Sequence, residues 1–303
     1  MNITTPITTL RYELHEVAEY INWIYFFHAW GFQPRFATVA GVHDCDSCRT
    51  QWLNSFEEAD RPKAAEAARL YGDARRLLAE LDGHYAARAA YRLLEAYADG
   101  DNLLLDGRRF PLLRQQTRQR PDAPFLCLSD FVRPLSQGIP DTVGAFATTV
   151  DAALEEVHAY DDYGHLLVKT LCERLAEAAA EKLHLTLRRH VWAYAPDEQL
   201  SLRQLLDEDY QGIRPAVGYP SLPDLSVNFL LDELIDFRRI GIRLTETGMM
   251  QPAASVSGLM FAHPAARYFA VGCIDEEQLA DYAARRGFPV ERMRPFLRSN
   301  LRS

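Results

Sequence analysis

The sequence predicts an α+β protein in which helices precede and follow a small antiparallel sheet. Two segments, 62–81 and 161–190, have the composition and the apolar spacing of helices with one buried face. Shorter apolar runs that are typical of strands occur at 125–128, 143–148, 242–247, 255–262 and 267–274. Because no connecting segment is long and polar enough to require a domain boundary, we expect a single domain over residues 1–303.

The first hundred residues give weaker signals. Residues 9–30 are apolar and rich in aromatic side chains, which predicts a mostly buried helix. Residues 31–60 contain glycine and proline and are expected to be irregular. For residues 84–105 the composition favours another helix, but Asp99 and Gly100 could equally turn a hairpin. Both interpretations stay open.

Local signals mark the ends of several elements in the C-terminal half. A capping box over 201–204 predicts the start of a short helix, and Asp224 is expected to cap the next one. Residues 262–266 are predicted to join two strands as a tight hairpin. A helix that begins at Asp275 is predicted to stop at Gly287, because glycine readily adopts the left-handed conformation that ends helices.

Composition and charge exclude several classes of protein. The formal net charge of -9 argues against nucleic-acid binding, which requires a basic surface. No apolar run approaches the roughly 18 residues that span a bilayer, and the first residues lack the features of a signal peptide. Five cysteines, an odd number without framework-like spacing, fit a reducing compartment. We therefore expect a cytoplasmic protein that binds neither nucleic acid nor membrane.

The segment HDCDSC brings His43, Cys45 and Cys48 together in the sequence. A CxxC pair can hold zinc or carry out redox chemistry. A structural zinc site usually needs four ligands, and no second paired cluster is present, so we predict a surface loop without a stoichiometric metal. Cys127, Cys172 and Cys273 stand singly in apolar runs and are expected in the core.

The most unusual segment is the loop YQGIRPAVGYP at 210–220. Its prolines make it stiff, while its glycines allow the backbone to approach a ligand. Arg214 has the planar guanidinium that suits a carboxylate or phosphate. Alternatively, Arg214 pairs with a neighbouring acid such as Glu208 and only fixes the loop. The sequence has no metalloprotease spacing, no GxSxG, no Walker loop and no GxGxxG at a strand–helix junction.

A series of blocks in the same order resembles the C-terminal activation domain of cobalamin-dependent methionine synthase. The resemblance runs from about residue 10 to the C-terminus and is weak over 31–110. The blocks are LRQQT (113–117), LSDFV (128–132), VGAFA (143–147), DDYGHLLVKTLCERLAEAAAEKLH (161–184), WAYAP (192–196), YQGIRPAVGYP (210–220), LTET (244–247) and PAASVSGLMFAHPAARYFAV (252–271).

The resemblance implies a C-shaped single domain with a bent antiparallel sheet flanked by helices. It divides the chain into a divergent, helical N-terminal part, 1–110, and a strongly family-like part, 111–303. In the family, this domain binds S-adenosylmethionine and covers the cobalamin domain when the cofactor has oxidised to cob(II)alamin. A flavodoxin-type donor then supplies one electron, and S-adenosylmethionine methylates the cobalt.

The resemblance also implies the site residues. Arg214 would bind the ligand carboxylate, and the neighbouring positions would line the groove: Glu177, Glu208, Ala216, Gly218, Tyr219, Tyr268 and Phe269. The family more often has tyrosine where Phe269 stands. Its YIDW motif, whose Asp contacts the ligand, is Tyr-Ile-Asn-Trp here, so Asn22 keeps the shape of that Asp without its charge.

Methyl transfer from a sulfonium to reduced cobalt moves no proton, so the resemblance implies no catalytic side chain. Positioning alone can supply roughly 7–11 kcal/mol in well-oriented systems. The chain begins near the family's domain start, which leads us to expect a reactivation subunit that acts in trans on a methionine synthase. Two alternatives remain: a docking partner that does not use S-adenosylmethionine, and a reactivator of another corrinoid methyltransferase.

Overall fold

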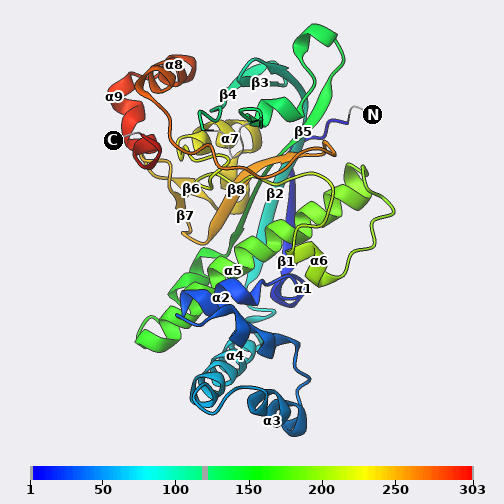
Figure 1. The fold of residues 1–303 in the computed structure, drawn as a ribbon, viewed down its shortest axis with the longest axis vertical. Helices are drawn as coiled ribbons and strands as arrows, with labels where there is room; N and C mark the ends of the chain where they lie inside the picture. Colours follow the sequence, from blue (N-terminus) through cyan, green and yellow to red (C-terminus); the bar gives the residue numbers. More distant parts are fainter. Residues whose placement is uncertain (1–2, 118–121, 302–303) are drawn as a thin grey trace.

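A six-stranded antiparallel sheet forms the centre of the molecule (Figure 1). The computed structural model describes residues 3–117 and 122–301. The strand order is β4-β3-β2-β5-β8, and β1 pairs with the N-terminal half of β2 beyond the end of β3. The strands of this sheet are β1 (Thr8–Glu13), β2 (Ala86–Asp99), β3 (Asn102–Leu105), β4 (Arg108–Pro111), β5 (Asp141–Val150) and β8 (Ser255–Phe261). A separate pair consists of β6 (Arg243–Leu244) and β7 (Met250–Gln251).

Helices cover the sheet and extend the molecule at both ends. In Figure 1, α3 and α4 lie at one end of the long axis, α8 and α9 lie toward the other, and α5 crosses the middle. The α-helices are α1 (Leu14–Ala18), α2 (Trp23–Ala29), α3 (Asp46–Asn54), α4 (Arg61–Leu81), α5 (Asp162–Thr186), α6 (Leu202–Leu206), α7 (Val227–Ile235), α8 (Glu276–Arg286) and α9 (Val290–Met293). Shorter helical turns are Pro34–Gly41, Leu128–Phe131, Leu135–Gln137, Ala152–Glu156, Leu187–Val191, Phe237–Ile240 and Arg294–Asn300.

Both faces of the sheet are buried along the strands β2, β5 and β8. Alternate residues of β2 point to opposite sides, so that Tyr91 and Leu93 belong to a core with α1, α4 and α5, whereas Ala90 and Leu94 belong to a core with α7 and α8. Burial on both faces removes the polar alternation by which a strand is usually recognised. The structure thus confirms the predicted α+β class with an antiparallel sheet.

Residues 84–105 form the hairpin of β2 and β3, not a helix. Asp99 pairs with Asn102, and Gly100 between them has the positive φ of 57° that tight hairpin turns require. The alanines that suggested a helix are small residues packed against helices on both faces of the sheet. Tertiary packing has overridden local propensity here.

The prediction of one helix over residues 9–30 is wrong. The segment consists of β1, the short helix α1, a turn and then α2. The turn ends at Asn22, whose side-chain oxygen accepts a hydrogen bond from the backbone N–H of Ile24 and so starts α2. Residues 31–60 are more regular than expected, because they contain a 3-10 helix and α3.

Several C-terminal predictions are confirmed and others are not. The long helices, the capping box at Ser201, the strands at 143–148 and 255–262, and the helix between Asp275 and Gly287 are all present. Asp224 does not cap α7 directly, since it accepts from the N–H of Ser226, the residue before the helix. Strand 242–247 is reduced to two residues, and no strand forms at 125–128.

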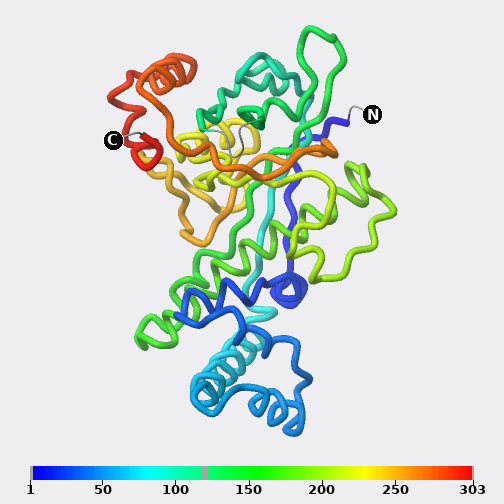
Figure 2. The backbone as a smooth tube through the Cα atoms, in the orientation of Figure 1, coloured from blue at the N-terminus to red at the C-terminus, as the bar shows by residue number. Residues whose placement is uncertain are grey.

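Residues 267–274 form no strand, and only Ile274 makes an isolated bridge, to Leu301, so the predicted hairpin over 262–266 is also wrong. Instead, this segment runs beside the loop at 210–220. Val271 donates its backbone N–H to Pro220, and the Ser221 hydroxyl bridges the backbone of Phe269. Figure 2 shows the orange chain after β8 passing the yellow-green loop on its way to α8. The segment is apolar because it packs against this loop.

Candidate functional site

One groove collects most of the residues that the sequence singled out. Two cavities of about 370 Å³ and 450 Å³ adjoin, since Arg214, Glu177 and Tyr219 line both. The groove lies between α2, α5, the residues after α6, the loop at 210–220 and the extended segment after β8. Eight of the nine predicted residues line it, namely Asn22, Glu177, Glu208, Arg214, Ala216, Tyr219, Tyr268 and Phe269.

Gly218, the ninth, shapes the loop without lining the groove. Its φ of 87° lies in the left-handed region, and its backbone N–H donates to Leu222. A second glycine, Gly258 on β8, lets the loop approach the sheet. A Cβ at Gly258 would lie 2.2 Å from the carbonyl oxygen of Pro215, so any other residue there would displace the loop.

Arg214 is held in the groove wall by three side chains. Its guanidinium donates to Glu181 at 3.0 Å, to His184 Nδ1 at 3.2 Å and to the Tyr210 hydroxyl at 3.3 Å. Burial disfavours its charge, but the surrounding acids and tyrosines, first of all Glu181, together outweigh this effect and hold the pKa of Arg214 well above its ordinary value. The pairing alternative considered for Arg214 is therefore present, with Glu181 and not Glu208 as the acid.

His184 is fully buried beside Arg214 and is neutral. Because an arginine can only donate, Nδ1 of His184 accepts from Arg214, and the ring proton is on Nε2, 3.1 Å from the Tyr194 hydroxyl. Burial, followed by the charges of Arg214 and Arg188, lowers the pKa of His184 well below its ordinary value. A neutral imidazole thus orients the arginine.

Acids surround the rest of the groove. Glu177 accepts a hydrogen bond of 2.6 Å from the Tyr219 hydroxyl. Burial raises the pKa of Glu208, partly opposed by Arg214. In the described part of the chain, Glu181 Oε1 has no hydrogen-bond donor, although it lies buried in the groove wall. The groove lining therefore combines the Arg214 guanidinium with several carboxylates.

Aromatic faces complete the lining. Tyr219 and Tyr268 are partly exposed, and the Tyr268 hydroxyl accepts from the backbone N–H of Arg214 at 2.9 Å. Phe269 is buried, with 5% of its surface exposed, so it forms part of the groove wall and packs into the protein behind it. Tyr25, which the sequence analysis missed, is 59% exposed and lines both cavities. Such a groove suits a ligand with a carboxylate, an ammonium group and a planar ring.

The sequence analysis also missed Glu181 and His184. Both lie on the face of α5 that carries the apolar residues packed on the sheet, so their burial follows from the helical spacing. Polar residues at buried positions usually have hydrogen-bond partners, and this rule could have identified them. A buried carboxylate at Glu181 would have predicted a nearby positively charged partner.

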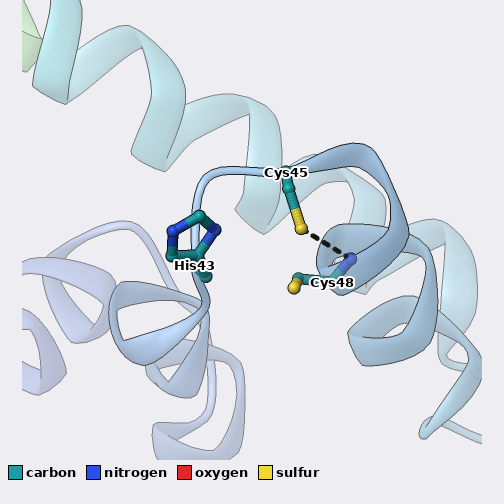
Figure 3. Close-up of side chains that lie close together, drawn as sticks. All are labelled: His43, Cys45 and Cys48. Carbon is teal, nitrogen blue, oxygen red and sulfur yellow. Dashed lines mark hydrogen bonds between the residues drawn. The ribbon is translucent and has the colours of Figure 1, made fainter.

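The thiol segment, residues 43–48, lies outside the groove at the start of α3. The ligand atoms of His43, Cys45 and Cys48 lie within 4.8 Å of one another (Figure 3). Hydrogen bonds, first from Cys48, lower the pKa of the Cys45 thiol to about 6, while the interaction with Cys45 raises the pKa of Cys48. Cys127 and Cys172 are buried as expected, but Cys273 is exposed, because its segment is not a sheet strand.

Comparisons with known proteins agree with this architecture. The family described as "Vitamin B12 dependent methionine synthase, activation domain" matches residues 13–287. A solved structure described as the MetH reactivation domain bound to AdoHcy is 34% identical, with a TM-score of 0.84. The similarity covers 98% of this chain and 91% of that one. Within residues 3–117 and 122–301, no helix has the length and hydropathy needed to cross a membrane.

Proposed function

Because this chain belongs to the activation-domain family of vitamin B12-dependent methionine synthase, we propose that its groove binds S-adenosylmethionine and that the chain supports reductive methylation of cobalamin. The similar structure was solved with AdoHcy, the product that remains after S-adenosylmethionine has given up its methyl group. The fold and 34% identity over nearly the whole chain support a binding site in the same place.

The observation that carries the proposal is the fixed guanidinium of Arg214. Three of its five N–H groups donate to Glu181, His184 and Tyr210, which leaves two for a ligand. Those two N–H groups fit the carboxylate of the methionine part. Because the arginine is already oriented, binding costs little side-chain entropy.

The remaining predicted residues have matching roles in this proposal. Asn22, Glu177 and Glu208 would surround the ligand's ammonium group, with Glu181 adding negative charge behind them. The Tyr219 and Tyr268 rings would contact the adenine and the sulfonium, while Phe269 supports them from below. Ala216 and Gly218 keep the loop narrow enough for close approach of its backbone.

When bound, S-adenosylmethionine supplies an electrophilic methyl group whose transfer requires no proton from the protein. The residues of the groove therefore act by positioning. Arg214 and the acids fix the two ends of the amino acid part, and the aromatic rings exclude water from the sulfonium. The partly exposed Tyr25, Tyr219 and Tyr268 at the mouth leave the methyl group accessible to an incoming corrinoid.

We further propose that the corrinoid arrives on a separate polypeptide, the cobalamin domain of a methionine synthase, in the cytoplasm. The similar structure is a reactivation domain and the matching family is an activation domain, so in this proposal a different domain carries the cobalamin. A flavodoxin-type protein would provide the electron. Mixing the purified chain with a cobalamin domain in the cob(II)alamin state should give a complex on gel filtration. No association in any cobalt state would contradict action in trans.

Calorimetric titration with S-adenosylmethionine tests the binding proposal itself. Saturable binding with one ligand per chain is expected. A chain that associates with the cobalamin domain but binds no S-adenosylmethionine would be a docking partner only. Association with a different corrinoid methyltransferase, and not with methionine synthase, would identify the other alternative.

A further inference from the structure

The thiol segment forms a compact set of metal-ligating atoms. His43 is exposed and the two cysteines are half-buried, and one ligand atom from each lies within 4.8 Å of the other two. The three side chains converge from a short stretch of backbone that ends in the first turn of α3 (Figure 3). The segment is separate from the groove, since none of its residues line either groove cavity.

Local hydrogen bonds favour the thiolate form that metal ions require. Cys45 is the N-cap of the nine-residue helix α3, and its sulfur accepts the backbone N–H of Cys48 at 3.2 Å. The Ser47 hydroxyl lies 3.3 Å from the same sulfur. Donors that point at a sulfur at the positive end of a helix stabilise negative charge there.

We propose that His43, Cys45 and Cys48 bind one thiophilic divalent ion such as Zn²⁺, with a water molecule as the fourth ligand. In tetrahedral zinc sites the Zn–S and Zn–N distances place the ligand atoms about 3.5–3.8 Å apart. Since the three atoms lie within 4.8 Å of one another, they need to approach by only about 1 Å to bind one ion.

This proposal departs from the expectation, based on the sequence, that the segment holds no metal. The expectation rested on the number of ligands in the sequence, because three ligands are one fewer than a structural zinc site usually has. The structure adds proximity, because one ligand atom from each of the three residues lies within 4.8 Å of the other two. Three protein ligands plus water is also a common zinc arrangement in proteins.

The neighbouring Asp44 does not supply the fourth ligand. Its carboxylate lies 2.8 Å from Arg49 and 3.6 Å from Arg75, so these two arginines already pair with it. His43, Asp44 and the two arginines line a cavity of about 340 Å³ beside the segment. The cavity gives water, or a small anion, access to the metal from the His43 side.

Titration with Co²⁺ tests the site directly. The full chain is reduced, freed of metal and titrated under anaerobic conditions, and absorption is recorded. One equivalent of Co²⁺ should produce the thiolate charge-transfer bands and the visible bands of a tetrahedral ion, and Zn²⁺ should abolish them. Elemental analysis of the purified chain should return one zinc.

Variants assign the ligands. Cys45→Ser and Cys48→Ser should each lose the charge-transfer bands. His43→Asn should weaken the affinity for Co²⁺ by more than the roughly 10- to 100-fold that is typical when a residue that only hydrogen-bonds to a metal ligand is replaced. Cys273→Ser, which removes an exposed thiol elsewhere, should bind as the wild type does. Absence of stoichiometric metal in the reduced wild type, or retained bands in both cysteine variants, would overturn the proposal. The proposal would also fail if the purified chain contained a Cys45–Cys48 disulfide and the chain still bound no metal once that disulfide was reduced.

Discussion

The groove and the thiol segment are built in opposite ways. The groove draws Asn22, Glu181, Arg214 and Tyr268 from elements far apart in the sequence, and its Arg214–Glu181 ion pair is largely buried. The thiol segment places its three ligand atoms within six consecutive residues at the surface. The geometry of the groove therefore depends on the whole fold, whereas the geometry of the thiol segment depends on a single turn.

The largest expected effect comes from breaking the buried pair in the groove. Glu181→Ala leaves the guanidinium of Arg214 without its carboxylate, and the side chains of this pair are only 11% and 7% exposed. We expect a loss of about 3 kcal/mol in the free energy of unfolding, the lower end for a buried pair that loses one partner, because the groove admits water. Urea denaturation measures it.

An exposed pair provides the control for this stability measurement. Arg108 and Glu233 lie 3.2 Å apart with both side chains more than half exposed, so Glu233→Ala should cost at most about 1 kcal/mol. Adding Arg214→Met to Glu181→Ala should recover part of the loss, since no buried charge then lacks a partner. Equal losses for Glu181→Ala and Glu233→Ala would show that the groove is not held by its buried pair.

The next effect is on ligand affinity. Arg214→Ala removes the proposed carboxylate contacts, worth about 1.5–3 kcal/mol, and should weaken S-adenosylmethionine roughly ten- to hundredfold in calorimetric titration. Because Glu181 also loses its partner, circular dichroism must first show that the variant is folded at the temperature used. Arg108→Ala is the matched control. Unchanged affinity in folded Arg214→Ala would refute the site assignment.

A third effect concerns pH. The pKa of His184 is lower in the folded chain than in the unfolded chain, so below about pH 6.5 only the unfolded state binds this proton. Stability should therefore fall as the pH drops from about 6.5, with a contribution of at most about 1.4 kcal/mol per pH unit from this residue. In His184→Asn, urea denaturation between pH 7 and 5.5 should show a shallower decline. An unchanged slope would mean that His184 does not remain neutral in the fold.

The smallest effect is at Asn22. Asn22→Asp adds a carboxylate near the proposed ammonium site and keeps the helix cap, because aspartate caps as well as asparagine does. We expect S-adenosylmethionine to bind more tightly, by less than about tenfold, since Glu177, Glu181 and Glu208 already supply negative charge. Asn22→Ser, which retains a capping oxygen without the charge, is the control. Weaker binding by Asn22→Asp would contradict the proposed ligand orientation.

Features that depend on neighbouring residues could be predicted from the sequence, whereas features that depend on contacts between distant segments could not. The capping box at Ser201 and the stop at Gly287 are local signals, and both are confirmed. β2 was ambiguous because burial of both faces removes the alternation of polar residues. The segment 267–274 resembled a strand because it is apolar, but its partner is a loop that no local pattern reveals.

Prediction of the candidate site was limited in the same way, by contacts between residues far apart in the sequence. The resemblance named eight residues that do line the groove, because their motifs are continuous in sequence. Glu181 and His184 were missed because the helical pattern of α5 was interpreted only as an apolar stripe. Their partner Arg214 lies some thirty residues later, and only the packing of α5 against the loop brings them together.

The loop at 210–220 also determines how the sheet ends. β8 is the last strand at one edge of the sheet, and backbone hydrogen bonds join its Ser257, Leu259 and Phe261 to the loop. An uncovered strand of this kind is a template for pairing with another chain and for aggregation. The loop that carries Arg214 thus also shields the molecule from self-association. If the groove binds S-adenosylmethionine as proposed, the same eleven residues both contact the ligand and cover the strand, so a substitution that removes a ligand contact leaves the second role in place.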